Sequence, residues 1–263
     1  MKIYAIFLSF YKDYEESGIN EFTSLVESLG LEYELFIVSN RIDNSLSQNN
    51  FILGDNSNWE FSGWDKGIAK ISSFADEDIF IFCNDTFCFH RQWGVAERRR
   101  FLKAFTRLIN SGEQGMSGEV NNVNKTFNLF GHSTDRWIST YLFAMTGGLL
   151  KKNKNKLSLP ESQLENAVIS ADQDKAVWGV GVCETLTAHI QDWLYPDSIN
   201  SGWYKAKDAP PAIKLRKAKT ILNEKYLSAF CTSFNGMLFP ANSNLLFRAF
   251  KRLQNILKKP NHF

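Results

Sequence analysis

Hydrophobic residues in the first 110 positions form two kinds of segment, which alternate along the chain. Residues 20–29 and 63–74 carry apolar side chains at helical spacing. Around them lie short apolar runs that are rich in β-branched and aromatic residues, as buried strands are, at 3–10, 33–38, 51–53 and 79–83. This alternation predicts βαβ units, in which right-handed crossovers join parallel strands.

The hydrophobic pattern after residue 95 predicts more helices, and for one segment it fits either a strand or a helix. Residues 115–134 are polar and predict a loop or irregular edge, whereas 137–146 predict an apolar strand or helix. Helical spacing recurs at 96–110, 184–194, 213–230 and 244–259. We therefore expect an α/β protein with a Rossmann-type, doubly wound, mostly parallel sheet in residues 1–205. Residues 206–263 are expected to form a helical C-terminal appendage.

Composition changes this picture mainly by arguing against certain classes of protein, namely nucleic-acid-binding and membrane-spanning proteins. The 263 residues are 44% hydrophobic, and 30 Lys and Arg nearly balance 28 Asp and Glu, so we expect no nucleic-acid partner. The first residues lack a small-residue cleavage site, and no apolar run is long enough to span a bilayer, which predicts a cytoplasmic protein. The basic amphipathic segment 244–259 predicts either peripheral membrane contact or packing on a partner or its own domain.

Residues that can bind a ligand follow the expected strands of the first half. In a doubly wound sheet, the ligand crevice lies at the carboxyl ends of the strands. The chain has neither a GxGxxG motif nor a P-loop, so a nucleotide phosphate bound there needs another source of positive charge. A divalent cation held by Asp85 is one source, because Mg²⁺ typically takes one or two protein carboxylates. The alternative is that Asp85 caps the turn that follows it.

The segments NWEFSGWDKGI and CNDT resemble nucleotide-sugar glycosyltransferases of the GT-A fold, in particular bacterial polysaccharide transferases related to rhamnan-synthesis enzymes. The resemblance covers roughly residues 2–194 and implies a nucleotide half, about 1–110, and an acceptor half, about 111–205. It also implies a nucleotide-sugar donor, a glycan or lipid-linked glycan acceptor, and Mg²⁺ or Mn²⁺ on Asp85. Only the last acid of the family's Asp-x-Asp motif is present, since the triplet here reads Cys83, Asn84, Asp85.

Several residues are expected to share the work of such a site. Glu184 is the predicted general base and Asp135 its substitute, although Glu184 also suits the first turn of a helix. His132 is a further candidate metal ligand. The predicted donor-binding residues are Ser39, Asn40, Asn56, Lys66 and Asn84, each of which is also common in turns or on exposed surfaces.

The reduced metal motif leaves a second function open. In this alternative, the chain is a non-catalytic, degenerate GT-A domain that binds a nucleotide or glycan within an assembly complex.

Overall fold

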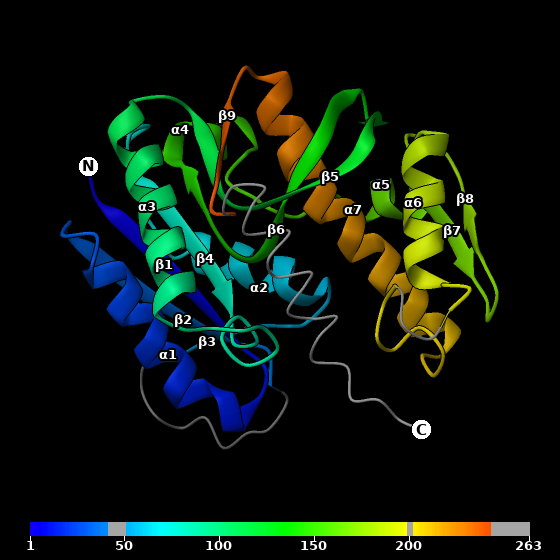
Figure 1. The fold of residues 1–263 in the computed structure, drawn as a ribbon, viewed down its shortest axis with the longest axis horizontal. Coiled ribbons are helices and arrows are strands. Elements are labelled where there is room, and N and C mark those ends of the chain that lie inside the picture. Colours follow the sequence, from blue (N-terminus) through cyan, green and yellow to red (C-terminus); the bar gives the residue numbers. More distant parts are fainter. Residues whose placement is uncertain (42–50, 199–201, 243–263) are drawn as a thin grey trace.

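A seven-stranded sheet with the strand order β3-β2-β1-β4-β6-β5-β9 forms the centre of the computed structural model, which describes residues 1–41, 51–198 and 202–242 (Figure 1). Strands β3, β2, β1 and β4 are parallel, β6 is antiparallel to both of its neighbours, and β9 is parallel to β5. The expected α/β class and mostly parallel sheet are therefore confirmed. The strands of this sheet are β1 (Ile3–Ser9), β2 (Tyr33–Ser39), β3 (Phe51–Leu53), β4 (Ile79–Asn84), β5 (Gly115–Leu129), β6 (His132–Thr146) and β9 (Met237–Pro240).

Helices cover both faces of the sheet. Cluster membership of the buried residues places α1 and α3 on one face and α2, α4 and α7 on the other. A separate pair of antiparallel strands, β7 (Val168–Ala171) and β8 (Ala176–Trp178), lies beside α6 (Figure 1). The helices are α1 (Lys12–Glu27), α2 (Trp59–Ile68), α3 (Val95–Ser111), α4 (Gly147–Lys152), α5 (Glu161–Ala167), α6 (Glu184–Leu194) and α7 (Pro211–Ser233).

The two-residue period of the strands explains these layers. In β4, Ile79, Ile81 and Cys83 face α1 and α3, whereas Phe80 and Phe82 face α2. Both sets are fully buried, so β4 reads as an unbroken apolar run, as expected for a strand covered on both faces.

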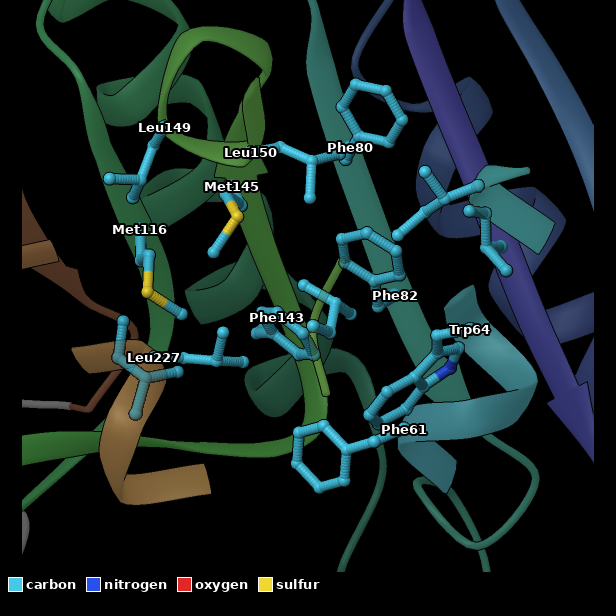
Figure 2. Close-up of a cluster of buried hydrophobic side chains, with 14 of the residues drawn as sticks. Phe61, Trp64, Phe80, Phe82, Met116, Phe143, Met145, Leu149, Leu150 and Leu227 are labelled. Carbon is cyan, nitrogen blue, oxygen red and sulfur yellow. The ribbon is translucent and has the colours of Figure 1, made fainter. Parts of the chain in front are cut away.

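An aromatic group fixes α2 on the sheet. Figure 2 shows Trp64 beside Phe61 and Phe82, and the Trp64 ring lies edge-on to that of Phe143 with centroids 5.6 Å apart. The indole N–H of Trp64 donates to the carbonyl oxygen of Cys83 at 3.1 Å, so its polar atom is satisfied although the side chain is fully buried. The start of α2 is thereby held near the carboxyl end of β4.

The polar segment 115–134 was expected to be a loop or irregular edge structure, and the loop interpretation is wrong. Most of it is β5, whose polar residues pair with β6 in a long hairpin with two irregularities in register. The pairing of β4 with β6 stops at Leu142, so the rest of the hairpin extends beyond β4. We call residues 119–141 the arm; in Figure 1 it reaches from the sheet toward α6 and α7. Cross-strand pairing and helix packing outweigh the low strand propensity of its Asn residues.

Among residues 206–242, the described part of the expected C-terminal appendage, α7 and β9 pack on the central sheet or pair with it. Leu227 and Phe230 of α7 belong to the same buried cluster as Phe82, and β9 pairs with β5 at the edge of the sheet. None of the helices in the described part of the chain is long and apolar enough to cross a membrane. The segment 244–259 lies outside the described residues, so its predicted membrane contact stays a prediction.

Candidate functional site

The crevice between β1 and β4 is the point where the strand order reverses, because β2 and β3 lie on the other side of β1. Asp85 directly follows β4, fills this crevice and is only 1% exposed. Its Oδ2 accepts hydrogen bonds from the backbone N–H groups of Phe10 (2.6 Å) and Tyr11 (2.5 Å), just before α1. Burial raises the pKa of Asp85, although these hydrogen bonds act in the opposite direction. The carboxylate is thus an internal partner for the amides that precede the helix.

Asn40 and Asn56 connect the end of β2 to the loop before α2. The Asn40 side-chain amide donates to the carbonyl oxygen of Trp59 at 2.9 Å and to Asn56 Oδ1 at 3.4 Å. A Cβ atom at Gly54 would lie 1.8 Å from Asn40 Oδ1, so the packing of this amide requires glycine there. Asn40 therefore holds two segments of the sheet edge together.

The other residues predicted to bind the donor lie at the same edge, and each is bound by protein groups. Ser39 Oγ accepts a hydrogen bond from the backbone N–H two residues later at 3.3 Å. The Thr86 hydroxyl donates to Asn84 Oδ1 at 2.7 Å. Lys66 forms a 2.9 Å ion pair with Asp55. The structure thus brings the five predicted donor residues to one edge, where their described contacts support the loops.

The predicted catalytic residues and His132 lie elsewhere. His132 begins β6 at the tip of the arm, where its ring packs against aromatic rings of α7. The β4–β6 pairing stops at Leu142, about ten residues or roughly 30 Å of strand away, so His132 does not join Asp85. Asp135 is exposed and pairs with the adjacent Arg136. Glu184 is exposed in the first turn of α6, which is the structural alternative considered above.

A cavity of about 310 Å³ lies beyond the carboxyl end of β4. The arm supplies Glu119, Trp137 and Thr140 to its lining, and α6 and α7 supply further side chains. Glu60, in the first turn of α2, and Arg91, between β4 and α3, bring the edge of the parallel sheet to the same space. This volume is at the lower end of the range typical of small-molecule sites, about 300–1,000 Å³.

Glu60 stands out among the acidic groups of the cavity. No other residue in the described part of the chain forms a hydrogen bond or salt bridge with its carboxylate, which has only its own backbone N–H as a hydrogen-bond donor there. Burial raises its pKa, and the negative charge of Glu224 acts in the same direction, while Lys217 and Arg216 oppose the shift. A half-buried carboxylate that no other described residue binds, facing a cavity, has the pKa shift expected of an acid–base group.

Glu224 and Lys225 form a pair that is satisfied within the protein. Glu224 Oε1 lies 2.8 Å from Lys225 Nζ, and Glu224 Oε2 accepts from the backbone N–H and hydroxyl of Thr140 at 3.1 and 3.2 Å. The Lys225 ammonium lies 3.4 Å from the centroid of the Trp137 ring. Burial lowers the pKa of Lys225 to about 8, while Lys225 and Thr140 hold the pKa of Glu224 low. This pair forms part of the cavity wall, and both Glu224 oxygens are bound by Lys225 or Thr140.

The side chains near Asp85 form a poor set of metal ligands. One Asp85 oxygen is bound by two amides, and His132 is remote. Within residues 1–41, 51–198 and 202–242, no three His, Cys, Asp or Glu side chains are grouped so that they can hold a metal ion. The Mg²⁺ or Mn²⁺ site inferred from the resemblance therefore stays a prediction.

Sequence reasoning missed the residues that line the cavity. Glu60 lies inside the segment that carried the family resemblance, but nothing in its spacing separates it from an ordinary first-turn acid. Lys217 and Glu224 come from α7, whose helical pattern is mixed because it faces both the sheet and the arm. Adjacent opposite charges at Glu224 and Lys225, between the apolar residues Leu222 and Leu227, were the available signal.

Comparisons with family models and with curated proteins found no match to this chain.

Proposed function

We propose that this protein is a GT-A-type glycosyltransferase, which moves a sugar from a nucleotide-sugar donor to a glycan or lipid-linked glycan acceptor. The observation that carries the proposal is the Glu60 carboxylate, which no other described residue binds, in a cavity at the carboxyl edge of a mostly parallel sheet. This edge is where doubly wound folds bind their ligands. The reversed strand β6 beside β4 is compatible with a GT-A sheet.

Glu60 takes the role of general base in this proposal, in place of Glu184. Its carboxylate accepts the proton of the acceptor hydroxyl while the hydroxyl oxygen forms a bond to the anomeric carbon. The bond from that carbon to the diphosphate breaks, and the diphosphate leaves with the electron pair. A raised pKa suits this step, because proton transfer is most efficient when the pKa of the base lies near the working pH.

The remaining lining groups suit a saccharide. Trp137 and Trp193 present aromatic surface, and Asn121, Ser139 and Thr220 present amide and hydroxyl groups. Sugar rings offer apolar C–H faces together with hydroxyl donors and acceptors, so a mixed lining of this kind supports their binding.

The test is a panel of nucleotide sugars, measured first by thermal shift and then by release of the nucleoside diphosphate. Binding to the folded state raises the melting temperature by mass action. We expect one nucleotide to raise it and the corresponding nucleotide sugar to be turned over. A shift without turnover, with all glycan acceptors tried, favours the non-catalytic binding domain. The absence of any shift contradicts the transferase and leaves the non-catalytic domain only as a glycan-binding protein.

A further inference from the structure

The segment between β4 and α3 holds an arginine at the cavity in a fixed orientation. The guanidinium carbon of Arg91 lies 3.8 Å from the centroid of the Tyr141 ring. Arg91 Nη1 lies 3.4 Å from Glu119 Oε2, and the Tyr141 hydroxyl donates to that same carboxylate oxygen. Ring stacking and a shared carboxylate thus orient the plane of the guanidinium.

Most of the donors on this guanidinium remain open. Arginine has five N–H donors, and the described residues accept only the one from Arg91 Nη1. The side chain is 46% exposed while it also lines the cavity, which places it at the cavity mouth. A planar group with pairs of open N–H donors matches the oxygens of a phosphate.

Other sources of positive potential along this edge are already engaged by acidic groups. The amides of Phe10 and Tyr11 bind the Asp85 carboxylate. Lys66 pairs with Asp55 at 2.9 Å, and Arg41 pairs with Glu15 at 3.2 Å.

Lys217 is a second cation that lines the cavity. Its ammonium lies over the rings of Trp59 and Trp193, 5.1 and 5.7 Å from their centroids. In the described part of the chain, no carboxylate lies within salt-bridge distance of it. Lys217 therefore adds positive charge to the space that Arg91 faces.

We propose that Arg91, with Lys217, binds the diphosphate of the donor, so that fixed side-chain cations balance the charge of the leaving group without a divalent cation. This inference rests on the proposed transferase function, and it arises because the two predicted metal ligands, Asp85 and His132, do not come together. It assigns the phosphate-binding role to a residue outside the motif positions at the strand ends.

The experiment measures binding of UDP, GDP, ADP, CDP and dTDP, and of the corresponding nucleosides, by calorimetry in EDTA. We expect the wild-type chain to bind one diphosphate under these conditions. Arg91→Ala should weaken that binding by about 10- to 100-fold, as expected for the loss of hydrogen bonds to a charged group, and leave nucleoside binding unchanged. Arg91→Lys keeps the charge but lacks the fork of N–H donors. Its affinity for the diphosphate should lie between those of the wild type and Arg91→Ala.

Arg136→Ala is the matched control, because Arg136 lies on the exposed side of the arm and pairs with Asp135. Its affinity should remain within about twofold of the wild type. A thermal melt of each variant confirms that the fold is retained.

The outcomes separate this inference from the function on which it rests. If binding requires Mn²⁺ and Arg91→Ala binds as the wild type does, the fixed-cation inference is overturned and the transferase proposal stands. If no diphosphate or nucleoside binds with EDTA or with Mn²⁺, the transferase proposal fails, and this inference fails with it.

Discussion

Asp85 and Glu60 are two carboxylates at the carboxyl edge of the same sheet, the first buried and the second half-buried, and their surroundings differ. Burial raises the pKa of both. Asp85 accepts hydrogen bonds from two distant backbone N–H groups, whereas the Glu60 carboxylate is bound by no other described residue and faces a cavity. Asp85 occupies the position that a motif would select, but its contacts are those of a structural group.

The difference shows how to separate structural from functional acids. A buried charge that the protein satisfies contributes to the fold, and its removal leaves other groups without partners. A buried charge that the protein leaves unsatisfied lowers stability, and such a cost is typical of active sites. The following substitutions test this distinction.

The largest expected effect is on turnover. Glu60→Gln removes the proposed base and should lower kcat by about 10²- to 10⁴-fold with little change in donor affinity. Release of nucleoside diphosphate from the turned-over nucleotide sugar measures it. The same change at Glu184, on the exposed first turn of α6, should leave kcat within about twofold. A large loss at Glu184 with none at Glu60 would reverse the assignment.

The next effect concerns Glu224, which resembles Asp85 in that its carboxylate is bound by groups of the protein. Lys225→Met leaves the Glu224 carboxylate without its cation in a buried wall and should lower the free energy of unfolding by about 3–5 kcal/mol. Urea denaturation measures this change. Lys151→Met is the control, because the Lys151–Asp76 pair is exposed and should contribute less than about 1 kcal/mol. Equal losses in the two variants would contradict the assigned burial of the Lys225 pair.

Asp85→Ala should lower the free energy of unfolding by about 2–4 kcal/mol, because the amides of Phe10 and Tyr11 lose their acceptor. Asp85→Asn keeps an acceptor oxygen and should cost less. Urea denaturation of both variants checks the order. If Asp85→Ala retains full stability but abolishes Mn²⁺-dependent nucleotide binding, Asp85 is a metal ligand and the comparison with Glu60 fails.

The smallest effect is a change in pH dependence. The Glu60 pKa is higher in the folded state than its ordinary value of 4.5. Between the unfolded and folded pKa values, the folded protein therefore binds more protons, and the free energy of unfolding falls as pH rises through that window. Glu60→Gln removes this loss, so we expect it to be more stable than the wild type at pH 7.

Thermal melts from pH 4 to pH 8 measure the difference between these two proteins. The difference should shrink toward zero as pH falls to about 4, below both pKa values. A Glu60→Gln variant less stable than the wild type at pH 7 would mean that the carboxylate is a stabilising group.

The sequence predicted the parallel half of the fold better than the arm. The strands β1 and β4 can be recognised in the sequence as apolar runs, because both of their faces are buried. Helix α6 was expected at its observed bounds of Glu184–Leu194. By contrast, β5 is a strand whose sequence does not show a strand pattern. Part of β5 is exposed and part faces the cavity, and polar side chains suit both places. The local pattern of hydrophobic residues indicates which segments are buried. It predicts strand pairing only where the paired strand is also buried.

The site was less predictable for a related reason. Position relative to a strand end is visible in the sequence, and it placed Asn40, Asp85 and their neighbours at one edge correctly. Whether protein groups already form hydrogen bonds to a carboxylate at this edge depends on residues far away in the chain. For Asp85 these are the amides 74 and 75 residues before it. The lining residues from α7 are brought to Glu60 only by the tertiary fold.

The cavity draws its lining from residues as far apart as Glu60 and Lys225. During synthesis on the ribosome, the sheet strands β1 to β4 emerge long before α7, which completes the cavity wall. The growing chain thus carries Glu60 and Arg91 for most of its synthesis without the wall that would enclose a ligand. The cavity is therefore complete only when α7, near the end of the described chain, has joined the core.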